Sequence, residues 1–113
     1  MKVSASQKLR YQAEIAKLKK QLRVNDTGIE VANIAAIYRM AGNRKRAFEW
    51  WKRASLNGKD GDAFLELGYC YQYGLGVRKN LSAARDAYRI AIRSKFVTAF
   101  DREEALYHVA IVY

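Results

Sequence analysis

Apolar residues recur every three or four positions along most of the 113-residue chain, which is the spacing of one face of a helix. The first helix is expected from Ser4 to about Leu22, and its apolar positions are Tyr11, Ile15, Leu18 and Leu22. Glycine and asparagine interrupt the pattern between such stretches. Further helices are therefore expected over residues 29–40, 44–56, 62–73 and 81–94, and from residue 102 onward.

The composition agrees with an all-α fold. The chain contains no proline, and its seven glycines lie mostly between the periodic stretches. Asn80 and Asp101 are candidate N-terminal caps, because their side-chain oxygens can accept hydrogen bonds from the first free backbone N–H groups of a helix. Half of the residues are apolar and 28% are charged, so we expect one folded domain over residues 1–113.

The apolar pattern also repeats over a longer period, which is typical of helical repeat proteins. Two sets of three residues match at an offset of 37: Ala47, Trp51 and Ala54 with Ala84, Tyr88 and Ala91. Upstream, the offset is 33: Ile34, Ala35 and Tyr38 with Leu67, Gly68 and Tyr71. The difference indicates a four-residue insertion near residues 74–77. A third, partial copy follows at an offset of 42: Ala105, Val109, Ala110 and Tyr113 with Ala63, Leu67, Gly68 and Tyr71.

Residues 63–91 resemble the Sel-one-like repeat, a subclass of the tetratricopeptide-like repeats. The resemblance depends on Ala63, Leu67-Gly68, Tyr71, Gly74-Leu75-Gly76-Val77, Ala84, Tyr88 and Ala91. The preceding copy lacks the glycine-valine turn and is closer to a plain tetratricopeptide repeat. Asn80, where the family often has an acidic residue, and the long connection from Ala91 to Ala105 are departures from the family pattern.

The resemblance implies a right-handed superhelix of antiparallel helix pairs that makes protein-protein contacts, and it implies no reaction. Under this interpretation residues 1–26 form an N-terminal basic helix, 27–58 a first repeat, 59–96 a second, Sel-one-like repeat, and 97–113 a half repeat. Tyr38, Tyr71 and Tyr113 are then expected in equivalent places.

In such stacks the first helix of each pair lines the concave side. Helical spacing selects the partner-binding candidates Arg39, Met40, Tyr69, Gln72, Tyr73 and Tyr107. Tyrosine, arginine and methionine suit this role because they combine a large contact area with a polar or adaptable end. The alternative is that Tyr69 and Tyr73 only pack against neighbouring helices.

The positive charge is concentrated in the first half of the chain. The net charge is +10, and residues 1–58 hold 13 lysines and arginines against four acids. A candidate basic patch comprises Lys17, Lys19, Lys20, Arg23, Arg44, Lys45 and Arg46. Such a surface attracts acidic proteins or nucleic acids, and the alternative is a solvated face with no ligand.

No catalytic, metal-binding or cofactor-binding pattern is found. His108 is the sole histidine and lies in an apolar run, and Cys70 is the sole cysteine, so neither a catalytic set nor a metal cluster is expected. The lone cysteine and the absence of a signal peptide pattern or of about 18 consecutive apolar residues favour a cytoplasmic protein without a membrane span.

We therefore expect an adaptor or inhibitor that binds an acidic protein or peptide. Small solitary repeat proteins of this kind are similar to immunity proteins that neutralise toxins. One alternative is a nucleic-acid-binding protein that uses the basic N-terminal half, and another is a structural oligomerisation module. Because the last helix is apolar nearly all round, we expect it to self-associate, to bind a partner, or to be covered by more repeats of a longer protein.

Overall fold

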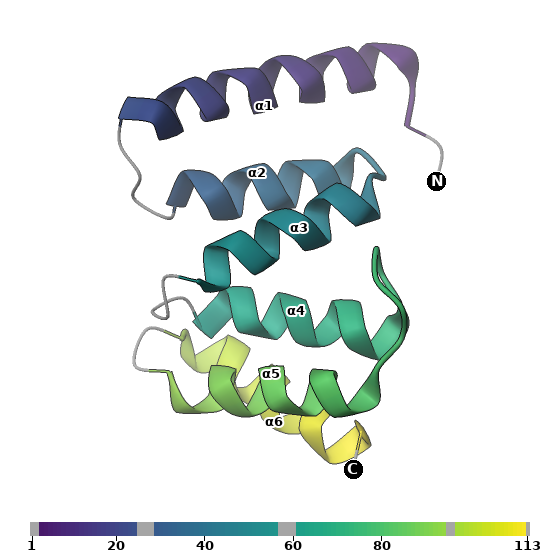
Figure 1. The fold of residues 1–113 in the computed structure, drawn as a ribbon, viewed down its shortest axis with the longest axis vertical. Coiled ribbons are helices and arrows are strands. Elements are labelled where there is room, and N and C mark those ends of the chain that lie inside the picture. The colour runs from purple at the N-terminus through teal and green to yellow at the C-terminus, as the bar shows by residue number, and fades with distance from the viewer. Residues whose placement is uncertain (1–2, 25–28, 57–60, 95–96, 113) are drawn as a thin grey trace.

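A computed structural model describes residues 3–24, 29–56, 61–94 and 97–112, and over these residues the chain forms six helices and no strand. This confirms the all-α prediction. The helices, shown in Figure 1, are α1 (Ala5–Val24), α2 (Ile29–Met40), α3 (Arg44–Ser55), α4 (Gly61–Tyr73), α5 (Leu81–Arg93) and α6 (Ala99–Val112).

The helices are arranged largely in chain order. From α1 to α5 they follow one another down the longest dimension of the molecule, which is 41 Å, and each packs against its neighbours in the chain (Figure 1). At the far end α6 packs on α5 and also contacts α4. No helix in the described ranges combines the length and the apolar character needed to cross a membrane.

The turn between α2 and α3 is short because one glycine adopts a left-handed conformation. Gly42 has a φ of 82°, which lets its N–H donate to the Arg39 carbonyl (3.0 Å) and lets the next N–H, of Asn43, donate to the Tyr38 carbonyl (2.9 Å). The Asn43 side chain then accepts from the Arg46 N–H at 3.1 Å and caps α3. The end of α2 and the start of α3 are thereby held together.

The turn between α4 and α5 closes in the same way but is four residues longer. Gly74 and Gly76 have φ values of 69° and 74°, and the Asn80 N–H donates to the Tyr71 carbonyl at 2.8 Å. The Asn80 side chain caps α5 by accepting from the Ala83 N–H at 3.0 Å. In both turns a capping asparagine thus donates to a tyrosine carbonyl, which agrees with the offsets of 33 and 37 found in the sequence.

Small residues bring the helices close together. Ala35, Ala84 and Ala91 are fully buried, as is the Tyr88 ring. Gly68 of α4 faces that ring so closely that any added Cβ atom would overlap it. Small residues at these positions therefore allow the close approach of the helices.

Tyr38 and Tyr71 each contact the helix that precedes their own. The Tyr38 hydroxyl accepts a hydrogen bond from Lys19 of α1, and the Tyr71 ring packs edge-on against Phe48 of α3, with centroids 5.4 Å apart. Tyr113 lies outside the described residues, so the expected equivalence of the three tyrosines stays a prediction.

The start of the last helix was predicted incorrectly. α6 begins at Ala99 instead of Arg102, and its cap is Thr98, whose hydroxyl accepts from the Asp101 N–H at 3.1 Å. Thr98 and Asp101 have the spacing of a capping box, in which the threonine is the cap and the acid lies three residues later. Asp101 therefore lies in the first turn of the helix, where a negative charge interacts favourably with the positive end of the helix dipole.

Candidate functional site

A groove of about 550 Å³ lies where the end of α2, the start of α3, the middle of α4 and α6 meet. We call it the central groove. Four of the six predicted partner-binding residues line it: Arg39, Met40, Tyr69 and Tyr73. They come from two helices that are separated in the chain by α3, so the fold brings them together. Its volume is in the range of ordinary ligand sites, about 300–1,000 Å³.

The polar wall of the central groove is an ion pair between α2 and α4. Arg39 Nη1 lies 2.9 Å from Glu66 Oε2, and the Arg39 side chain stays 54% exposed. Burial raises the pKa of the Glu66 carboxyl, while the Arg39 guanidinium counteracts that rise. Because a guanidinium carries five N–H donors, Arg39 can hold Glu66 and still donate to an acidic ligand.

Another part of the lining is aromatic and is built around His108 of α6. The His108 ring stacks on Tyr88 at a centroid distance of 5.6 Å and meets Tyr69, Tyr107 and Tyr73 edge-on at 4.9, 5.3 and 6.3 Å. Tyr69 also donates to Glu104 Oε2 at 3.2 Å, the same oxygen that lies 3.6 Å from His108 Nε2. The Tyr69 ring is therefore held firmly in place.

Burial raises the pKa of Tyr69, Tyr88 and Cys70, which lie in or next to this part of the groove. Burial first, and then the Glu104 carboxylate, raises the pKa of Tyr69, and burial raises the pKa of Tyr88. Burial raises the pKa of the Cys70 thiol to about 11, and this thiol lines the central groove. A protonated thiol is a poor nucleophile, so Cys70 contributes an uncharged contact to the groove.

Gln72 is a correction to the sequence prediction. Its side chain is buried, with 6% exposed, and accepts a hydrogen bond from the Tyr88 hydroxyl. Leu65, which the same pattern places in the groove, is also buried. Both lie on the side of α4 that faces α5, whereas Glu66, Tyr69 and Tyr73 lie on the side that faces the groove.

Tyr107 was predicted to bind a partner, but the neighbouring residue His108 is the one that lines the central groove. Tyr107 is 64% exposed and contacts the His108 ring, but it is not among the residues that line the central groove. His108 does line it, and its Nδ1 atom is buried without a partner among the described residues. Trp51, from α3, is a further lining residue that the sequence argument missed.

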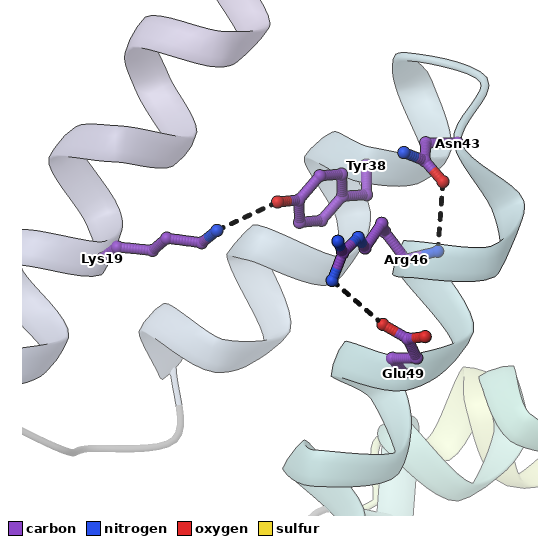
Figure 2. Close-up of polar contacts among 5 residues, drawn as sticks. All are labelled: Lys19, Tyr38, Asn43, Arg46 and Glu49. Carbon is purple, nitrogen blue, oxygen red and sulfur yellow. Dashed lines mark hydrogen bonds and ion pairs between the residues drawn. The ribbon is translucent and has the colours of Figure 1, made fainter.

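The predicted basic patch divides into residues with different surroundings. Lys17, Lys20, Arg44 and Lys45 are exposed, and Arg46 lies 3.4 Å from Glu49. Lys19 is partly buried and donates to the Tyr38 hydroxyl at 3.1 Å, as Figure 2 shows. The Arg23 side chain lies outside the part of the chain that the structure describes. The patch is thus two clusters, one on α1 and one at the start of α3.

Aromatic rings accompany the basic residues on this side of the molecule. Lys19 Nζ lies 5.5 Å from the centroid of the Trp50 ring, and the Arg53 guanidinium lies 5.0 Å from it. These cation–π contacts fix the long side chains against the surface.

Comparison with protein-family models, curated proteins and solved structures found no match to this chain. Within the described ranges, no three or more His, Cys, Asp or Glu residues are grouped so that they could hold a metal ion. The inference of function therefore depends on the geometry of this chain.

Proposed function

We propose that this protein is a protein-protein interaction module that binds an acidic segment of a partner in the central groove. The observation that supports this most is the convergence of Arg39, Met40, Tyr69 and Tyr73 on one groove of about 550 Å³. Helical spacing places these residues on the first helices of the proposed repeats, and their side chains combine a large contact area with a polar or adaptable end.

The proposal includes a tetratricopeptide-like arrangement of the helices, with α2 and α3 as one repeat, α4 and α5 as the next, and α6 as a half repeat. Two features support this arrangement. The turns that follow α2 and α4 close with the same asparagine-to-tyrosine hydrogen bond. The helices that begin the repeats, α4 and α6, also contact each other. In such a stack the first helices line the binding surface.

The lining of the groove favours a particular ligand chemistry. Trp51 and Leu75 provide apolar surface, and Met40 and Tyr73 are about half exposed, so they can close over an apolar side chain. Arg39 and Arg44 line the same groove, and a nearby carboxylate would meet one of them. With a net charge of +10, the whole molecule also attracts acidic segments. We expect a ligand with one bulky apolar residue beside an aspartate or glutamate.

Peptide selection from a random displayed library on the full chain tests this proposal. The selected peptides should share an acidic residue next to an aromatic or leucine residue. Binding by fluorescence anisotropy should weaken about tenfold or more in Tyr73→Ala and in Met40→Ala, because residues at the centre of an interface contribute at least ~1.4 kcal/mol each.

Leu9→Ala is the matched control. Leu9 is 67% exposed on α1 and does not line the central groove, so its truncation removes a similar apolar area elsewhere. Circular dichroism verifies that each variant folds. The proposal is wrong if the selected peptides lack an acidic residue, or if all three variants bind equally well.

A further inference from the structure

We infer that the face of α1 turned toward α2 and α3 is a second binding site, which takes a single-stranded nucleic acid. Two hollows lie along this face. One, of about 560 Å³, is lined by residues that include Lys8, Tyr11, Tyr38, Arg44 and Lys45. The other, of about 310 Å³, is lined by Lys19, Leu22, Trp50 and Arg53. We call the pair of hollows the α1 groove.

The charge of the α1 groove has one sign. Among the described residues, every charged side chain that lines either hollow is lysine or arginine. They come from both sides, with Lys8 and Lys19 on α1 and Arg44, Lys45 and Arg53 on α3. A concave surface whose charged residues are all cations raises the local concentration of polyanions.

Lys19 connects the two hollows into one path. It lines the smaller hollow, while its Nζ donates to the hydroxyl of Tyr38, which lines the larger one (3.1 Å; Figure 2). The same Nζ lies 5.6 Å from the Tyr38 centroid and 5.5 Å from that of Trp50. Cations and aromatic rings therefore alternate along the groove.

The length of the α1 groove and its alternating cations and aromatic rings favour a nucleic acid as the polyanion. Lys8 and Lys19 are eleven residues apart, which is about 16 Å along a helix. That span exceeds a single phosphate and fits a few nucleotides of an extended strand. Single strands bind where cations contact the phosphates and aromatic rings stack on the bases. Tyr11, Tyr38 and Trp50 are partly buried against the core, and an acidic peptide would use the cations but not the parts of these rings that stay exposed.

The test is the binding of a fluorescent oligonucleotide of about 12 residues to the full chain between about 50 and 200 mM salt. The logarithm of the affinity should fall linearly with the logarithm of the salt concentration. In Lys8→Glu/Lys45→Glu the affinity should fall at least tenfold. The slope should become shallower by about 1.4, because each phosphate contact on a single strand contributes roughly 0.7. Tyr11→Leu should lose a further several-fold through stacking.

Lys17→Glu is the control on the same helix. Lys17 is exposed and lies nine residues from Lys8, so it is on the opposite side of α1. Thermal melting verifies that the variants fold. A loss confined to the groove variants supports the site. The single variant Lys8→Glu changes the same charge as Lys17→Glu, so equal losses in these two variants would show unspecific attraction. Polyglutamate that displaces the oligonucleotide at equal charge would show an acidic-protein site. Either result, or no binding, overturns the inference.

Discussion

At the start of α4, Asp62 lies against Asp101 of α6, and one of the Asp62 carboxyl oxygens is buried without a hydrogen-bond partner in the described structure. Burial first, and then the hydrogen bond with Asp101 and its charge, raises the pKa of Asp62 from 3.8 to about 6. The Thr98 backbone N–H acts in the opposite direction. The fold therefore favours the protonated form of Asp62.

This pair predicts a specific pH dependence of stability. Between about pH 4 and pH 6 the folded chain holds a proton at Asp62 that the unfolded chain has lost, so this contribution to the free energy of unfolding falls as the pH rises through that window. Asp62→Asn should remove the fall and raise the melting temperature at neutral pH. Thermal melts across the window measure both effects, with Asp86→Asn, on an exposed site of α5, as the control. Identical pH profiles for the two variants would contradict the assignment.

At the scale of the helices, the contact between α4 and α5 depends on the absence of a side chain at Gly68. The Tyr88 ring occupies the place where a Cβ would project, and its hydroxyl donates to Gln72 one turn further along α4. The ring is fully buried and stacks on His108 of α6. Three helices are thus positioned by one tyrosine.

Gly68→Ala should therefore destabilise the protein although alanine favours helices. The added methyl must displace the Tyr88 ring, and overpacking of this kind costs about 1–3 kcal/mol. Urea denaturation followed by circular dichroism measures the loss. Tyr88→Leu removes the overlap at the cost of the ring, so the loss from Gly68→Ala should be smaller in the Tyr88→Leu background. Additive losses in the double variant would show that the overlap is not the cause.

The sequence predicted the bounds of the helices well because local chemistry determines them. α2 begins and ends at the residues expected, since Gly42 and Asn43 stop it and cap α3. The error at α6 arose because Thr98 and Asp101 are both good caps, and only the capping-box spacing distinguishes them. The four residues from Thr98 to Asp101 together indicate where α6 begins, whereas Asp101 taken alone does not.

At the scale of the whole molecule, the site was only partly predictable. Helical spacing places Leu65, Tyr69, Gln72 and Tyr73 on one broad face of α4, but it does not say which neighbouring helix covers each part of that face. The packing of α5 decides this, and it buries Gln72. His108 entered the site only because α6 packs against both α4 and α5. Such contacts between distant segments leave no periodic signal in the chain.

Several large apolar side chains of α6 are exposed. Phe100, Tyr107 and Ile111 are 54–70% exposed and follow helical spacing, and Leu106 is 49% exposed beside that stripe. Apolar residues gathered in this way favour association, whereas the net charge of +10 opposes it. We therefore expect the weight-average mass in light scattering to rise with protein concentration and, because salt screens the repulsion, with salt concentration. This salt dependence is opposite in sign to that of nucleic-acid binding in the α1 groove.

Leu106→Ser/Ile111→Ser should abolish the association, since each removed side chain takes away roughly 1–2 kcal/mol of apolar burial at the contact. Leu9→Ser, at an exposed apolar site on α1, should leave it unchanged. A mass that stays monomeric up to millimolar concentration at high salt would rule out self-association through α6. If Leu9→Ser and the α6 variant lowered the mass equally, general surface hydrophobicity would be the cause, because a contact through α6 would not depend on Leu9 of α1.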